Sequence, residues 1–383
     1  MSEINKEGGG LRAGDLFGLR VISEEGLLLG RICDQSCRSQ DGAAALTLGA
    51  SPLISLIEHD AIRFLNEKLK MRLVPEPFWI ARMRYLTKSL NSHLEYSEYS
   101  RQANAIIEQL GIRFKNHTGF LARFKNSIQP DIAMVYFEGI PLCSNYTAAH
   151  FLTSDDYNSL ENGNGQYARG LGYDLGVTGS AISRLARDLY SEDTFRMPVF
   201  DVQYNDLRYL EMILPLKEKG VEDPVCFFFF SELLILMSSV DALAGLGCLS
   251  DLARFKFRVV TLDHAFEPIN KFSSYVRADN PDIRYPPSFL QEIGSLISRE
   301  DRKWLNKSRL LRNAFVHYDF NDYVEGAAEV LSLSGVLDEI CLAATGQQYE
   351  EYCISLNSVR EKLMNGVKGM IGFPDYDFMK DPM

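Results

Sequence analysis

A short basic segment, residues 307–319, carries the side chains of this chain that are best suited to chemistry. Within it Arg312 precedes His317 by five positions, and Asn313 directly follows the arginine. Arginine is a permanent cation whose planar group fits a phosphate, and histidine is the side chain that titrates near neutral pH. Together a guanidinium and an imidazole are enough to cleave a phosphodiester without a metal ion.

The surroundings of this pair distinguish it from a chance match. Residues 299–312 are rich in lysine and arginine, whereas residues 222–383 as a whole are acidic. A second pair with similar spacing, Arg258 and His264, stands in the middle of an apolar helical run. We therefore treat Arg258 and His264 as a coincidental match, and Arg312 and His317 as the candidate catalytic pair.

Helix geometry limits how Arg312 and His317 can act together. On one straight helix, positions five apart differ by about 140° and are displaced by roughly 7.5 Å along the axis. Either the helix ends between the two residues, or a second subunit completes the site. Asn321 is a good helix cap, so residues 318–321 favour a helix end here. An alternative without chemistry is that Arg312 pairs with Asp319 and His317 only caps a helix.

Residues 312–318 (RNAFVHY) resemble the motif of the HEPN superfamily, which consists of helical bundles. The resemblance covers about 150 residues, roughly 222–370, and implies a homodimer whose paired motifs meet in a cleft and cleave RNA without a metal. Members modified by partner nucleotidyltransferases carry a tyrosine two places after the histidine. This chain has Asp319 there, so tyrosine modification is not expected.

The mechanism expected from the pair is attack of an RNA 2′-OH on the adjacent phosphorus. His317 acts as general base or acid, Arg312 stabilises the charge that develops on the phosphate oxygens, and Asn313 orients the phosphate or His317. Further contacts to nucleic acid are expected from three neighbours, Lys307, Arg309 and Tyr318. No cofactor is expected, and the sequence contains no paired metal ligands.

Two carboxylates stand on the very apolar stretch from Val225 to Leu249, namely Glu232 and Asp241. A carboxylate in such surroundings should have a partner. Arg312 is a candidate partner for Glu232, which would then orient the arginine; an unrelated lysine or solvent is the alternative. Because a carboxylate near the middle of a bilayer costs about 2.5–3.5 kcal/mol, we expect a buried bundle helix here and not a membrane span.

A competing motif occupies residues 171–189, which resemble the helix-turn-helix of bacterial repressors. Gly176 falls at the expected turn, and the side chains that would face DNA are Ser180, Ser183, Arg184 and Arg187. Gly170 and Gly172 argue against it, because each weakens the first helix by about 1 kcal/mol. The alternative to an enzyme is therefore a non-catalytic nucleic-acid-binding protein, either an RNA-binding HEPN bundle or a helix-turn-helix regulator; an ordinary capped helix is the other interpretation of this segment.

Composition sets further bounds. A chain of 383 residues is expected to form two or three domains, and a net charge of −11 argues against coating nucleic acid without specificity. Seven cysteines are an odd number, and Cys33 and Cys37 lack a second pair for zinc, so reduced thiols in a cytoplasm are expected. Residues 61–125 are the most basic long stretch, either a solvated helix surface or a face that contacts RNA.

The expected fold class is α+β, with a mixed α/β N-terminal region followed by an all-α HEPN-like bundle. Residues 1–150 are predicted to contain a hairpin at 17–33, a strand at 45–48, a helix starting at Ser51-Pro52, a long helix at 78–110 and a hairpin around Glu138-Gly139. Residues 151–221 are predicted to be a loop-rich linker, 222–370 the bundle, and 371–383 a tail. Within the bundle, Asp223, Ser298 and Asn321 are the expected helix starts and Gly346 a helix end.

These observations combine into one hypothesis. The chain is expected to be a cytoplasmic, metal-independent HEPN-type endoribonuclease that dimerises through residues 222–370 and has no membrane segment. A role as a toxin or anti-phage effector, with the N-terminal region sensing or binding a regulatory partner protein, follows from the family resemblance alone.

Overall fold

The computed structural model describes residues 11–38, 40–71, 78, 80–81, 83–84, 103–106, 131–147, 166–187, 190–197, 200, 202–279, 285–324 and 332–374. The fold is mostly helical with one small antiparallel sheet, which agrees with the predicted α+β class. The predicted long helix at 78–110 and the basic stretch at 61–125 lie largely outside the described residues.

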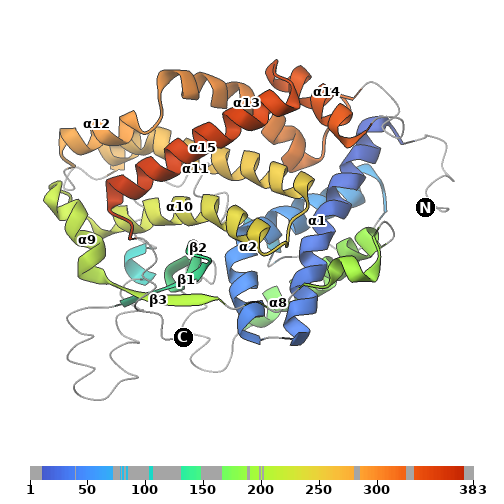
Figure 1. Cartoon of the computed structure of the whole chain (residues 1–383), viewed down its shortest axis with the longest axis horizontal. Coiled ribbons are helices and arrows are strands. Elements are labelled where there is room, and N and C mark those ends of the chain that lie inside the picture. Colours follow the sequence, from blue (N-terminus) through green and yellow to red (C-terminus); the bar gives the residue numbers. More distant parts are fainter. Residues whose placement is uncertain are drawn as a thin grey trace.

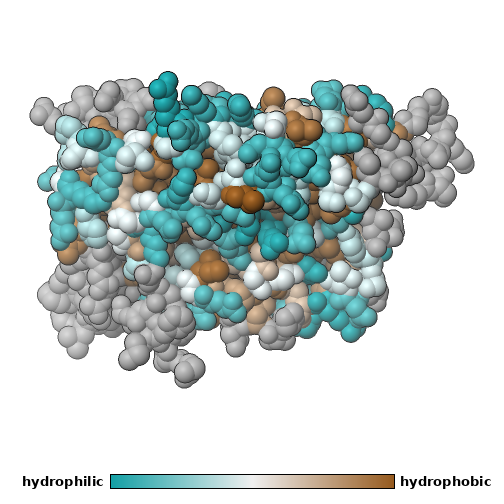
Figure 2. Space-filling view, turned by 45° about the horizontal axis from the view of Figure 1, so that its top comes forward, coloured by the Kyte–Doolittle hydropathy of each residue, from teal (hydrophilic) through white to brown (hydrophobic). Residues whose placement is uncertain are grey.

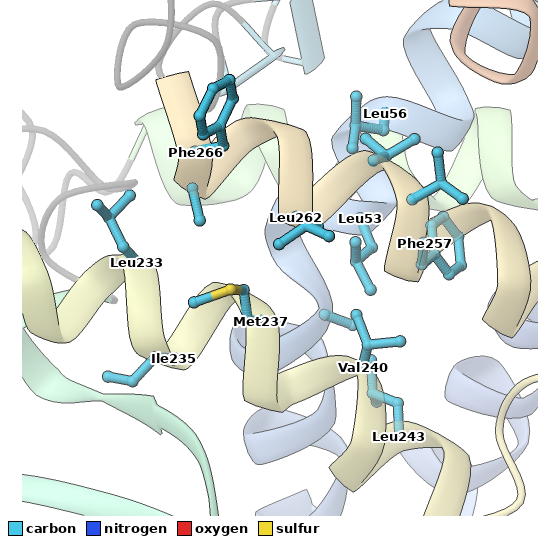
Figure 3. Close-up of a cluster of buried hydrophobic side chains, with 14 of the residues drawn as sticks. Leu53, Leu56, Leu233, Ile235, Met237, Val240, Leu243, Phe257, Leu262 and Phe266 are labelled. Carbon is cyan, nitrogen blue, oxygen red and sulfur yellow. The ribbon is translucent and has the colours of Figure 1, made fainter. Parts of the chain in front are cut away.

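Helix α10 (Pro224–Gly245) forms the centre of the molecule (Figure 1). It begins as predicted, because the carboxylate of Asp223 accepts a hydrogen bond from the Val225 N–H and Pro224 occupies the first turn. Helices α11 (Asp251–Asp279) and α15 (Tyr349–Ile371) pack against α10, and the sheet covers another side. Figure 3 shows side chains of α10, α11 and α2 meeting in this core, among them Met237, Leu262 and Leu53.

Helix α10 is also the one described helix that is long and apolar enough to cross a bilayer. In its most apolar window 94% of the residues are buried inside the protein. The helix therefore serves as a core element, as predicted, and its apolar surface is covered by its own chain.

The sheet has the strand order β2-β1-β3, with both pairs antiparallel. Strand β1 (Asp131–Phe137) and strand β2 (Ile140–Ser144) form the predicted hairpin, and β3 (Gln203–Arg208) adds to the other edge of β1. Glu138 and Gly139 both have positive φ, 49° and 78°, as a two-residue hairpin turn requires. The hairpin around these two residues is thus confirmed.

The predicted hairpin at 17–33 and strand at 45–48 are wrong, because α1 (Ala13–Arg38) and α2 (Gln40–Arg63) are helices. Gly26, in the middle of the predicted hairpin, lies inside α1 where it packs against α8 (Gln166–Arg187). A Cβ on Gly26 would lie 2.9 Å from the carbonyl oxygen of Ile182. The glycine permits two helices to approach closely, and such a glycine cannot be distinguished from a turn residue by sequence.

Ser51 and Pro52 do not begin a helix either; both lie within α2. Proline has no N–H to donate to the carbonyl four residues earlier, which belongs to Leu48. The Ser51 hydroxyl donates to that Leu48 carbonyl at 2.6 Å and replaces the missing bond. This local compensation explains why α2 continues through a proline.

The helix-turn-helix prediction is also wrong. Residues 171–187 belong to one continuous helix, α8, in which Gly176 is an ordinary helical residue and not a turn. Ser183, expected to face DNA, is buried at 7% exposure. Helix α8 packs along α1 and α2, so one of its faces is used for folding.

The C-terminal helices follow the predicted pattern with one correction. Ser298 caps α13 (Arg299–His317), and Gly346, with φ of 80°, ends α14 (Leu333–Thr345). Asn321 does not open the next helix: it lies in a turn, and α14 begins after Ser332. The remaining described elements are the π-helical turn η1 (Phe64–Lys68), the 3-10 turn η2 (Glu192–Phe195), α9 (Tyr209–Glu218) and α12 (Pro287–Ser295).

Among the described residues, one large apolar core extends from Phe17 to Phe373 and crosses the predicted divisions at residues 150 and 221, and a small separate cluster contains Leu27, Ala186 and Phe195. The predicted tail starts too early, because Ile371 still belongs to α15 and the Phe373 ring stacks on Phe227 at 6.3 Å. This shared core brings α1 and α2 next to α11 and α13, and so places N-terminal side chains beside the candidate catalytic pair.

Candidate active site

Arg312 and His317 both lie in α13, in its last turns. The helix continues from Arg312 to His317 and ends at Tyr318, which adopts the left-handed conformation with φ of 53°. The predicted helix end exists, but it follows His317 and does not separate the two residues. Side chains from other helices must therefore complete any site that uses both residues.

The guanidinium of Arg312 is held by α11. Oδ2 of Asp263 lies 2.7 Å from Nε and 2.6 Å from Nη2, and Nη1 donates to Oδ1 of Asn313 at 2.8 Å. A guanidinium has five N–H bonds. Among the described residues these contacts leave an N–H on each terminal nitrogen for a further acceptor, and the side chain is 22% exposed.

Two sequence expectations about Arg312 are thereby corrected. Its carboxylate partner is Asp263, whereas Asp319 pairs with Lys68 at 2.7 Å. Glu232 does not orient the arginine; it lines a small cavity with sheet residues such as Met134. Asp241, the other carboxylate of α10, binds Arg258 of the second Arg–His pair.

The sequence prediction missed Asp263 because no catalytic motif surrounds it. One usable signal is the spacing of charged residues on α11, where Asp263 and Glu267 follow Lys256 by seven and eleven positions. Such spacing places charges on one face. That face receives Arg312 and also Arg309, whose guanidinium binds Glu267.

His317 is 55% exposed, and its Nδ1 lies 3.9 Å from Oδ1 of Asp60 on α2. Partial burial lowers the pKa of His317, and this effect exceeds the opposing charge of Asp60. The positive charges of Arg84, Arg312 and Arg63 lower the pKa further. The imidazole is consequently neutral at pH 7 and able to accept a proton.

Asp60 is 5% exposed and stays ionised. Burial by itself raises the pKa of Asp60, but a hydrogen bond from His59 and the charge of Arg84 outweigh it and lower the pKa. The Arg84 Nε donates to Oδ2 of Asp60 at 3.0 Å, and the His59 Nδ1 lies 3.4 Å from Oδ1. A fixed carboxylate thus stands beside His317, contributed by a helix more than two hundred residues away in the sequence.

A buried charged group lies directly beyond the end of α13. The Tyr318 hydroxyl donates to Oε2 of Glu25 at 2.7 Å, and the Lys256 Nζ lies 2.7 Å from Oε1 of the same carboxylate. Lys256 also lies 3.9 Å from the centre of the Tyr318 ring. Burial raises the pKa of Tyr318, so the hydroxyl remains a donor. These contacts fix the end of α13 on α1 and α11.

Tyr318 therefore cannot contact nucleic acid as predicted, because it is 0% exposed. Lys307 is exposed on α13 and is accessible to a ligand, whereas Arg309 is occupied by Glu267. Of the three side chains predicted to contact nucleic acid, Lys307 is therefore the one that is exposed and forms no ion pair with a described residue.

The second Arg–His pair has a structural role. Arg258 binds Oδ1 of Asp241 at 2.8 Å and Oδ1 of Asn357 at 3.0 Å, and His264 is buried at 3% exposure. Arg360 binds the other oxygen of Asp241 at 2.6 Å, so α10, α11 and α15 are joined at this point.

Within the described part of the chain, no three His, Cys, Asp or Glu side chains are grouped so as to hold a metal ion. Comparison with known proteins gives no further guidance: no family model, no curated protein and no solved structure matches this chain.

Proposed function

We propose that this protein is a metal-independent endoribonuclease of the HEPN type that acts through Arg312 and His317. The observation that supports the proposal is their arrangement at the end of α13. Five positions apart in its last turns, α13 carries an arginine whose contacts with described residues leave terminal N–H bonds for a phosphate, and a half-exposed imidazole with a lowered pKa. A proton acceptor beside a fixed phosphate-binding cation is the minimum that RNA transesterification needs.

In the proposed reaction His317 takes the proton of the ribose 2′-OH. The 2′ oxygen forms a bond to phosphorus, the bond from phosphorus to the 5′ oxygen breaks, and that oxygen receives a proton. The products are a 2′,3′-cyclic phosphate and a 5′-OH. Arg312 donates its remaining N–H bonds to the non-bridging oxygens, while Asp263 and Asn313 hold the guanidinium in place.

The proposal includes assembly as a homodimer through residues 222–370 and a location in the cytoplasm. The four consecutive phenylalanines of α10 take no part in such a dimer surface, because residues 227–230 are at most 3% exposed within the chain. The face drawn in Figure 2 carries only separate hydrophobic patches among hydrophilic side chains. Light scattering at micromolar concentration tests the dimer, and a monomer would remove this part of the proposal.

A role as a toxin or anti-phage effector controlled by a partner protein belongs to the same proposal and rests on the family resemblance. If the bundle only binds RNA, it should retain RNA in filter-binding assays and release no shortened product.

The deciding experiment incubates purified protein with labelled RNA and with DNA of the same sequence, in the presence of EDTA. Cleavage of RNA alone, with 2′,3′-cyclic phosphate ends, is the expected result because DNA lacks the nucleophile. His317→Ala should reduce the rate by roughly 10²–10⁴-fold, the usual contribution of a proton-transfer group. Arg299→Ala, an exposed arginine at the other end of α13, is the matched control and should cleave normally. A His317→Ala protein that cuts at the parental rate would overturn the proposal.

A further inference from the structure

One carboxylate oxygen lies near two imidazoles. Oδ1 of Asp60 is 3.4 Å from Nδ1 of His59 and 3.9 Å from Nδ1 of His317. The two ring nitrogens can therefore be no farther apart than the sum of these two distances. The rings come from α2 and α13, and His59 retains 19% of its side-chain exposure.

The proposed cleavage moves two protons, one from the 2′-OH and one to the departing 5′ oxygen. A neutral imidazole accepts the first proton but has none on the same nitrogen to deliver at the same moment to the opposite side of the phosphorus. His317 is the neutral ring, as its half-exposed position among cations indicates. A second proton-transfer group is then needed for the leaving oxygen.

We infer that His59 is this second catalytic residue and acts as the general acid, with Asp60 holding both rings in position. The inference rests on the proposed function. In this inference both imidazoles come from one chain. In a dimeric site, by contrast, the second imidazole would be the partner's His317.

The charges around the two rings suit this division of roles. Arg84 fixes the far oxygen of Asp60 at 3.0 Å, so Oδ1 is directed to the imidazoles. Arg63 and Arg84 contribute positive charge from the α2 side, and Arg312 contributes it from α13. A phosphate placed between the rings would meet these cations, and the carboxylate of Asp60 would lie behind the rings as an orienting group.

The leaving group provides a test that separates an acid from a base. Uridine 3′-(p-nitrophenyl) phosphate releases a phenolate that departs without being protonated, whereas a dinucleotide such as UpA releases an alkoxide that needs a proton. His59→Gln should reduce UpA cleavage by roughly 10²–10⁴-fold and leave the nitrophenyl ester nearly unaffected. His317→Gln should impair both substrates, because both need the 2′-OH to be activated. In the pH–rate profile for UpA, each variant should lose one of the two limbs.

Circular dichroism and thermal unfolding first establish that both variants fold. Parental rates for His59→Gln on both substrates, with His317→Gln impaired, would overturn the role of His59 and leave the proposed function intact. Equal loss on both substrates by folded His59→Gln would also overturn it, because an acid must discriminate between leaving groups. Full activity of His317→Gln would instead overturn the proposed function itself.

Discussion

Two Arg–His pairs of similar spacing lie on neighbouring helices and have different surroundings. On α11, Arg258 is bound by Asp241 and Asn357, and His264 is buried in the core. On α13, the contacts of Arg312 with described residues leave it N–H bonds for a ligand, and His317 is half exposed. The difference arises because the α11 pair lies in mid-helix between packed neighbours, whereas the α13 pair lies at a helix end.

The comparison shows that the spacing of two residue types does not define a site. A histidine can take part in acid–base chemistry when it is reachable and has a defined protonation state. The end of α13 supplies access, and Asp60, Arg84 and Asp263 supply the surrounding charges. Variants of both pairs therefore test whether the surroundings, and not the spacing, distinguish a catalytic pair from a structural one.

Among the arginine variants, the largest effect is expected from Arg312→Lys. Lysine keeps the charge but cannot hold Asp263 and Asn313 while also offering two parallel N–H bonds to a phosphate. We expect the turnover of RNA to fall by roughly 10²–10³-fold, the usual cost of removing a donor to a developing oxyanion. Arg258→Lys is the matched control. Equal losses in the two variants, measured per folded molecule, would erase the distinction between the pairs.

The next effect concerns the buried charges that fix the end of α13. Lys256→Met leaves Glu25 without its cation in a fully buried place, and breaking such a pair costs roughly 3–5 kcal/mol. Urea unfolding followed by circular dichroism should show this loss. Adding Glu25→Gln should recover part of it, since no unpaired charge then remains. A single variant as stable as the parent would mean that the pair does not hold the three helices together.

A smaller loss is expected for Arg258→Met. It removes one of two cations from Asp241, and the second cation, Arg360, remains in place. We expect about 1–3 kcal/mol lower unfolding free energy, typical of a lost hydrogen bond to a charged group. Cleavage per folded molecule should not change. If cleavage fell while stability did not, Arg258 would belong to a catalytic site, contrary to its structural role.

The smallest expected effect concerns two carboxyl groups of α2, those of Glu58 and Asp60. Asp60 is ionised, whereas burial raises the pKa of Glu58 well above its ordinary value. The Thr178 hydroxyl donates to Oε2 of Glu58 and also lies 2.5 Å from the Asp174 carbonyl oxygen, but burial outweighs this hydrogen bond and favours the neutral carboxyl group of Glu58. Its contribution to stability is complete below the unfolded pKa of about 4.3 and is lost as the pH rises through the folded pKa.

The melting temperature of the parent protein should therefore decline between pH 5 and pH 8, and Glu58→Gln should abolish this decline. At pH 8 the unfolding free energy of the variant should exceed that of the parent by an amount on the order of 1 kcal/mol. Thermal unfolding across this pH range measures it. Asp60→Asn is the control, because the lowered pKa of Asp60 acts in the opposite direction: its stabilising effect is present above the unfolded pKa and is lost in acid. Parallel pH profiles for the parent and Glu58→Gln would contradict the assignment.

Capping and turn residues predicted local structure correctly where residues close together in the sequence make the hydrogen bonds. Asp223 and Ser298 accept hydrogen bonds from N–H groups of the turn that follows, and Gly346 takes the left-handed conformation that ends α14. The Glu138-Gly139 hairpin belongs to the same class. The same kind of signal gave wrong predictions at Gly26 and Pro52. Gly26 permits the close approach of α8, and the Ser51 hydroxyl replaces the hydrogen bond that Pro52 cannot donate.

Motif spacing and capping residues predicted the candidate pair, the helix that carries it and a helix end close to His317. The side chains that surround the pair follow from the packing of the helices. Asp60, Asp263 and Lys256 reach it from α2 and α11, and the partners of Arg312 and Tyr318 are separated from them by 49 and 293 positions. Such contacts depend on how helices pack, and the spacing of residues along the chain carries no record of the packing.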